Sequence, residues 1–174
     1  MINILVVHVK ISRIFILLIY GLLFFQLPTH AQEKPPRPIA VYVSPIQGLS
    51  FGKIIMGASG GTVTVSPTGN RSSTGSVILV DNGVSWTPAL FEIEANRGTL
   101  INIVNGPDAV LTGSNGGSLT LEIGGSDPVS PFVITASYPT RTYLRIGGTL
   151  IIGAPASNPR GSYSGTFIIN FFQE

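Results

Sequence analysis

The chain has 174 residues, with ten basic side chains, eight acidic side chains, two histidines and no cysteine. The absence of cysteine excludes disulfide bonds, thiolate metal sites and a lipid anchor carried on cysteine. Both histidines, His8 and His30, lie in the N-terminal segment.

This N-terminal segment has the layout of a secretory signal peptide. Lys10 and Arg13 precede an unbroken apolar stretch at residues 14–25 (IFILLIYGLLFF), and small residues follow at Thr29 and Ala31. The order of a charged region, an apolar region and a small-residue site predicts cleavage after Ala31. Twelve residues of helix would span only about 18 Å, against roughly 30 Å of hydrocarbon, so we expect no stable transmembrane anchor after cleavage.

Removal of residues 1–31 decides which kinds of site the exported chain can carry. It leaves 143 residues (174 minus 31) without histidine or cysteine, and eight basic residues (ten minus Lys10 and Arg13) against eight acidic ones. That length is enough for one core and too short for two domains. A basic footprint for nucleic acid is missing, and no imidazole is present for catalysis or metal binding. We expect a non-enzymatic protein without cofactor or metal.

Beyond the cleavage site, the pattern predicts an extended linker and one β-domain. Residues 32–38 (QEKPPRP) are rich in proline and are expected to be extended. From residue 39 to residue 174, short apolar runs alternate with period two between clusters of turn residues, which predicts a single antiparallel β-sandwich. The predicted strands, in chain order, cover residues 39–43, 62–66, 76–80, 90–95, 100–104, 119–123 and 143–152.

Glycine-rich stretches precede several of these strands. Residues 57–65 and 113–121 share the pattern G-x-x-G-G-[ST]-[VL]-T-[VL], and residues 147–152 repeat its second half. A phosphate-binding loop needs a helix N-terminus directly after the glycines, whereas a strand follows here each time. We therefore predict turns that lead into strands.

Glu92 and Glu94 are the one acidic pair with a spacing that suits chemistry. On a strand they project from the same face, about 6.8 Å apart along the backbone, which is within reach of the two carboxylates of a glycosidase. However, Phe91, Ile93 and Ala95 alternate with them and are expected to face the core. This alternation favours a solvated outer face for both glutamates.

Aromatic side chains offer two further candidates. A lone tryptophan in a small sandwich is more often buried, but an exposed indole can stack on a sugar ring, so Trp86 is a candidate ligand contact. Tyr138 and Tyr143, with Arg141 and Arg145 nearby, are a candidate surface patch.

The chain ends in a strand-like segment with no polar tail, residues 161–174 (GSYSGTFIINFFQE). Chain ends are usually frayed unless something holds them, so this ending predicts a strand that is part of the core. Burial of each large apolar side chain contributes roughly 1.5 to 3 kcal/mol. The residues predicted to build this structural C-terminal strand are Gly161, Tyr163, Gly165, Phe167, Ile169 and Phe171.

An ordered set of motifs resembles a known family. The motifs are LSFGKI at 49–54, GGTVTVSPTGNRSSTGSVIL at 60–79, PALFEIEANRGTLINI at 88–103, LRIGGTLII at 144–152 and GSYSGTFIINF at 161–171. They are similar to a secreted bacterial family known only as domain of unknown function 4402.

A more distant resemblance is to spore coat U and chaperone-usher pilin subunits. It rests on Phe51 and Gly52 and on the closing G-x-Y-x-G-x-F strand, while Gln173 stands where such pilins carry an aromatic residue. The resemblance implies an incomplete, immunoglobulin-like (pilin-like) sandwich whose missing strand comes from a neighbouring molecule.

Two functions are expected on this basis. The first is a structural or assembly protein of the periplasm, outer surface or extracellular space, which pairs strands with itself or with an assembly chaperone. The alternative is a self-contained β-sandwich module that binds an envelope component or a glycan. The segment at 39–43 distinguishes them: closure of its own sheet favours the module, and a projecting segment favours the subunit.

The signal peptide gives the first testable prediction. Mass spectrometry of the protein recovered from the envelope or the medium should show an N-terminus at Gln32, because cleavage is expected after Ala31. Recovery of intact residues 1–31 in the membrane fraction would show that the segment is an anchor.

Overall fold

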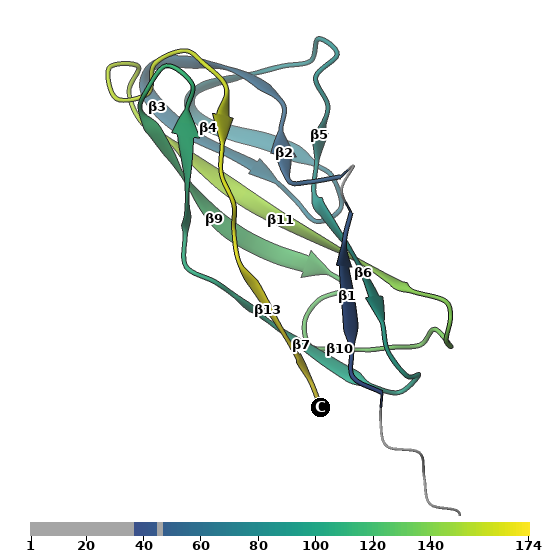
Figure 1. Ribbon diagram of the computed structural model, residues 1–174. Helices are drawn as coiled ribbons and strands as arrows, with labels where there is room; N and C mark the ends of the chain where they lie inside the picture. The colour runs from purple at the N-terminus through teal and green to yellow at the C-terminus, as the bar shows by residue number, and fades with distance from the viewer. Residues whose placement is uncertain (1–36, 45–46) are drawn as a thin grey trace, which may run out of the picture. The chain divides into compact units, whose positions relative to one another are not determined.

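The computed structural model describes residues 37–44 and 47–174, and every regular element within them is a β-strand (Figure 1). The all-β, antiparallel sandwich class expected from the sequence is therefore confirmed. The predicted signal peptide (1–31) and most of the predicted linker (32–38) lie outside the described residues. In the described part of the chain, no helix is long and apolar enough to cross a membrane.

The described residues form thirteen strands, several of which are longer than the sequence predicted. They are β1 (Ala40–Val43), β2 (Ser50–Phe51), β3 (Lys53–Val65), β4 (Arg71–Val80), β5 (Trp86–Thr87), β6 (Ala89–Glu94), β7 (Leu100–Asn105), β8 (Ala109–Gly113), β9 (Ser118–Asp127), β10 (Phe132–Val133), β11 (Thr142–Ile152), β12 (Tyr163–Ser164) and β13 (Ile169–Gln173).

Strand β11 organises the main sheet because it pairs along its whole length. One edge of β11 pairs with β9, while the other edge pairs with β6 through residues 142–146 and with β3 through residues 148–152. The sheet order is β1-β6-β11-β9-β8-β12, and β4 pairs with β3 off this path. All of these pairs are antiparallel.

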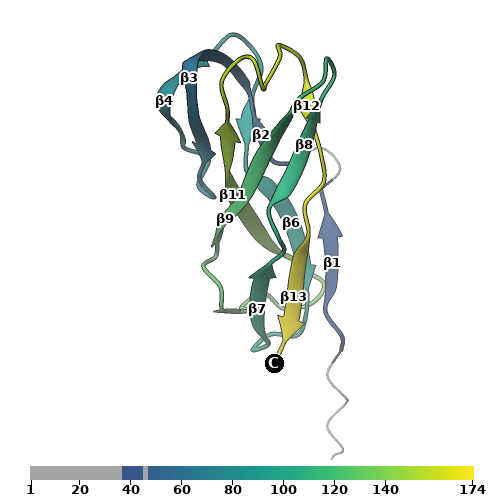
Figure 2. The same cartoon turned by 90° about the vertical axis from the view of Figure 1, so that its left-hand side faces the viewer.

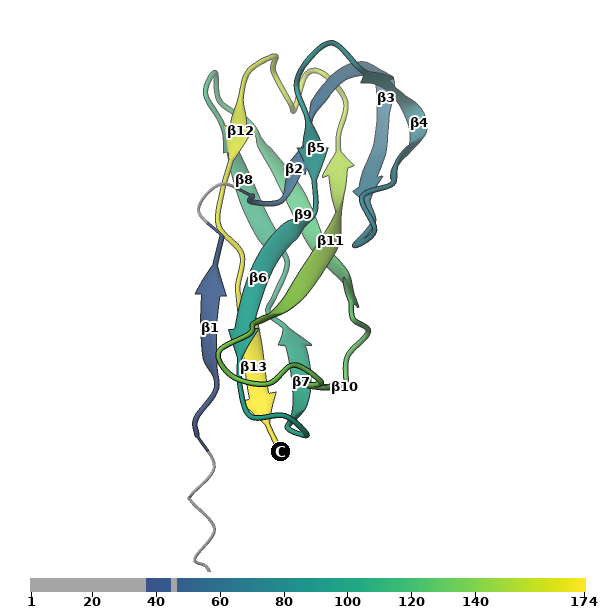
Figure 3. The same ribbon diagram turned by 90° about the vertical axis from the view of Figure 1, so that its right-hand side faces the viewer.

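A smaller sheet has the order β10-β7-β13, and its strands β7 and β13 adjoin β8 and β12 of the main sheet along the chain. Strand β8 follows β7 after residues 106–108, and β13 follows β12 after residues 165–168. The antiparallel ribbon of β8 and β12 therefore runs on as the ribbon of β7 and β13 (Figure 2). This continuity brings the last strand of the chain alongside the first (Figure 3).

Two apolar clusters fill the interior between the sheets. The most deeply buried members of the first are Val63 and Val65, and those of the second include Ile93, Ile101 and Leu144. The side chains that pack against both clusters are Leu49, Ile123 and Phe167. The two clusters are thereby joined into one interior.

The glycine motifs have two different structural roles. Residues 113–117 make the turn between β8 and β9, as predicted, with positive φ angles at Gly116 and Gly117. The prediction of turns at 57–61 and 147–148 was wrong, because both lie inside strands as register shifts, in β3 and in β11. At Gly60, φ is +70° and an added Cβ would lie 2.3 Å from the carbonyl oxygen of Ile152. Glycine is needed there for close packing of strands.

The structure divides the C-terminal segment into β12 and β13, with residues 165–168 extended between them. Tyr163, Phe167, Ile169 and Phe171 are partly buried against the core, whereas the intervening side chains are exposed. Gly161 and Gly165 are exposed as well, so the inward face is built by the four large side chains alone.

Phe167 should carry a large share of the stability of this segment, because it packs against both clusters. We expect Phe167→Asp to destabilise the domain by roughly 3 kcal/mol or more, since it removes that packing and places a carboxylate beside apolar groups. The neighbouring exposed change Thr166→Asp is the control, and should stay within about 0.5 kcal/mol of wild type. Urea unfolding monitored by circular dichroism measures both. Equal midpoints for the two variants would contradict this role.

Candidate functional site

Among the described residues, the outer edge of the last strand carries backbone groups with no strand partner. Glu174 and Leu100 exchange both backbone hydrogen bonds, and Gly106 N–H donates to the Ile168 carbonyl oxygen. In an antiparallel ladder such bonded pairs alternate with pairs whose N–H and C=O point the other way. The even-numbered residues of β13 therefore bond to β7, and the backbone groups of Ile169 and Phe171 point away from it.

The same alternation holds in the ribbon of β12 and β8. Ser114 N–H donates to the Ser162 carbonyl oxygen, so the bonded positions are again even-numbered. The backbone groups of Tyr163 then point away from β8. The odd-numbered residues of both final strands thus share one open edge.

Strand β1 presents a matching edge. It pairs with β6, with Ala40 opposite Glu94, and Ser44 N–H donates to the Leu90 carbonyl oxygen just beyond the strand. The even-numbered residues therefore bond to β6, and the backbone groups of Val41 and Val43 point away from it.

A single side chain connects the two open edges. Ile39 N–H donates to Oε1 of Gln173 over 3.1 Å, and Nε2 of Gln173 donates to the Arg37 carbonyl oxygen over 3.3 Å. No backbone ladder joins β1 to β13 within the described residues. Because a side chain makes the crossing, the strands stand farther apart than the roughly 4.8 Å of paired neighbours. We call the open line between residues 39–44 and 47–56 on one side and residues 160–173 on the other the seam.

The upper part of the seam is an apolar groove. Residues 49–56 form one wall, residues 160–163 form the other, and Leu111, Leu119 and Leu150 lie at the floor. The groove exists because β3 pairs with β11 only from Gly61 onward, whereas its first residues pair with β4 alone. The Tyr163 hydroxyl donates to the Pro159 carbonyl oxygen over 2.6 Å and holds the second wall.

The residues that line the groove fall within one family match, and so does the seam apart from residues 39–40 and 172–173. The model of domain of unknown function 4402 matches residues 41–171. The chain belongs to the domain of unknown function 4402 family. No curated protein and no solved structure matches it.

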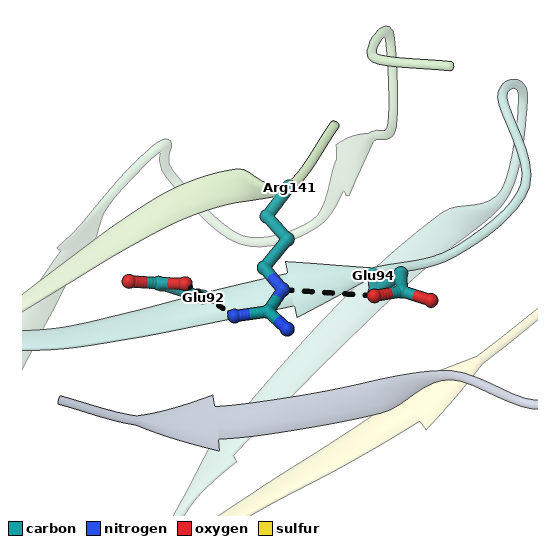
Figure 4. A network of polar contacts seen from close by, with 3 residues as sticks. All are labelled: Glu92, Glu94 and Arg141. Carbon is teal, nitrogen blue, oxygen red and sulfur yellow. Dashed lines mark hydrogen bonds and ion pairs between the residues drawn. The ribbon is translucent and has the colours of Figure 1, made fainter. Parts of the chain in front are cut away.

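In this DUF4402 domain the acidic pair is held by an arginine (Figure 4). Nη1 of Arg141 lies 2.8 Å from Oε2 of Glu92, and Nε of Arg141 lies 3.6 Å from Oε2 of Glu94. The guanidinium also lies over the Tyr42 ring, 3.8 Å from its centroid. The hydrogen bond to Glu92 raises the pKa of Arg141 above its ordinary value, so this group stays charged. Both carboxylates face outward, as predicted, but as partners of Arg141.

The aromatic candidates of the DUF4402 domain lie apart from the seam or only touch its rim. Nε1 of Trp86 donates to the Gly69 carbonyl oxygen over 3.1 Å, and the Arg71 guanidinium lies 4.5 Å from the ring centroid. Its N–H and one ring face are thus engaged within the domain. Tyr143 is 56% exposed next to Glu92, and the Tyr138 ring has Arg37 over it at 4.5 Å.

No pattern in the sequence predicts the seam as a site, although its two sides are each predicted to be strands. Residues 39–43 and 161–171 alternate in the way that predicts strands. Which of their edges stays unpaired depends on the register with β6 and β7, and this register is set by contacts between residues that lie 48 to 72 positions apart along the chain. The Gln173 bridge could have been suspected only from its polar character at a position between aromatic and acidic neighbours.

Proposed function

We propose that this chain is a non-enzymatic structural or assembly protein, exported to the periplasm, outer surface or extracellular space, whose seam takes up a β-strand from another polypeptide. The observation that carries the proposal is the pair of facing edges. Val41 and Val43 on one side, and Ile169 and Phe171 on the other, aim backbone donors and acceptors into the same gap.

An inserted strand would satisfy both edges and complete the core. Each new backbone hydrogen bond contributes about 0.5 to 1.5 kcal/mol. The side chains on either side of the seam, Ile39, Val41, Ile169 and Phe171, are only partly buried, and a strand laid between them would cover their remaining apolar surface. Main-chain pairing supplies affinity in this mode, and alternate side-chain pockets supply specificity.

The composition supports a role without chemistry. Residues 32–174 contain neither histidine nor cysteine, and the strongest titratable cluster in the described residues is the Arg141 network, in which each charge has an opposite partner. A protein with this composition is better suited to packing and pairing than to proton transfer.

The second candidate is a self-contained module that binds an envelope component or a glycan. It is favoured by β1, which pairs with β6 of its own sheet and does not project. It is also favoured by the outer face on which Tyr42 and Tyr143 flank Glu92 in register across three strands. Strand pairing remains the better-supported function, because β1 keeps one open edge even while it is paired.

A proline at Val43 tests the proposal. Val43 is 66% exposed and its N–H points into the seam, so Val43→Pro removes a donor from the seam and spares the ladder with β6. Val43→Thr keeps the N–H and is the matched control. In cells that produce the protein, wild type and Val43→Thr should run as complexes on unboiled gels, and Val43→Pro should reduce the complexes about fivefold, as expected for one lost hydrogen bond.

Monomers in every case would contradict the proposal. If all three proteins run as monomers from the envelope fraction at every concentration, the seam is not an assembly site. The self-contained module would then be the function of this domain.

A further inference from the structure

The wall and floor residues of the upper seam carry charge of one sign only. Two of the residues that line the groove are basic, Lys53 on one wall and Arg160 on the other, and both are exposed. No aspartate or glutamate of the described residues lines it. The floor between the two cations is apolar, with Leu111, Leu119 and Leu150. A chain that lies here meets apolar surface below and positive charge at the rims.

The N-terminal segment of this chain is poorly suited to fill the seam, either in its own molecule or in a second copy. Residues 32–38 include Pro35, Pro36 and Pro38, which lack the N–H that pairing along two edges requires. The apolar residues that follow are already paired with β6 as β1. Moving β1 into a second copy would leave its own β6 edge unpaired, so the exchange gains little.

Gln173 limits how far an inserted strand can run. Its carboxamide occupies the N–H of Ile39 and the C=O of Arg37, which are the groups that a strand at the lower end of the seam would need. Pairing along the C-terminal segment is therefore open from Tyr163 in β12 to Phe171 in β13, a span of nine residues. This is a usual length for a β-strand.

We infer that the seam selects a proline-free strand of about nine residues from a different protein, with apolar side chains at alternate positions and acidic side chains where it passes Lys53 and Arg160. The inference rests on the proposed function and adds the chemistry of the partner. The apolar side chains would lie on the leucine floor, and the acidic ones would meet the two cations at the rims.

Labelled nine-residue peptides test this inference on the chain from Gln32 to Glu174. The first peptide alternates valine with threonine and has glutamate as its second and eighth residues. One of the two glutamates then lies near Lys53 and Arg160 whichever way the peptide runs along the seam. The second has lysine at those two places, and the third has proline at two central threonine places. Fluorescence anisotropy gives the dissociation constant of each.

We expect the glutamate peptide to bind about fivefold more tightly than the lysine peptide at low salt, as for two exposed ion pairs, and the proline peptide to bind far more weakly. The difference between the first two should shrink in 0.5 M salt, because exposed charges are screened. The double change Lys53→Glu and Arg160→Glu should reverse the order. Arg97→Glu, an exposed change outside the groove, should leave the order unchanged.

The outcomes separate this inference from the proposed function. Equal binding of the glutamate and lysine peptides would overturn the charge selection and leave strand uptake intact. Preferential binding of a peptide with the sequence of residues 32–43 would overturn the inference by showing that a second copy is the donor. If no peptide binds at all, both the inference and the proposed function fail.

Discussion

The arrangement of this domain follows from the cost of leaving the edge of a strand unpaired. The main sheet curls until its first strand, β1, lies alongside the last strands of the chain (Figures 2 and 3). The two edges then stop short of pairing, and only the carboxamide of Gln173 crosses between them. Unpaired edges are a liability that proteins cover, twist or charge. Here the open edge is long and apolar on its inner side, and it is the edge that we propose pairs with another chain.

The path of β11 explains why the seam widens into a groove. Strands β6 and β3 pair with the same edge of β11, on either side of Gly147, where the register between β11 and β9 shifts. Beyond this point the sheet divides into a branch with β6 and a branch with β3. The hairpin of β3 and β4 leaves the sheet beyond the bulge at residues 57–60, which depends on glycine for its close contacts. Turns were predicted at these glycines, but they form the bulge at which the hairpin leaves the sheet. The groove over Leu119 and Leu150 is open for this reason.

Period-two alternation was enough to predict the class of fold and most strand positions. Each predicted strand overlaps an observed one, and the alternation of residues 163–171 agrees with which large side chains lie against the core. Strand β8, the early part of β3 and the seam were not predicted. Val110 and Ile55 point outward from these strands, so apolar residues occur on both faces there and weaken the alternation. Edges are decided by pairing between distant segments, which a local pattern does not contain.

Amide hydrogen exchange followed by NMR on the chain from Gln32 to Glu174 tests the open seam most directly. The account predicts that the amides of Ile169 and Phe171 exchange rapidly, while those of Asn170 and Phe172, which bond to β7, are protected. Addition of a strand that occupies the seam should protect Ile169 and Phe171 as well. Protection of all four amides in the isolated chain would show that the edge is already closed, and would contradict the account.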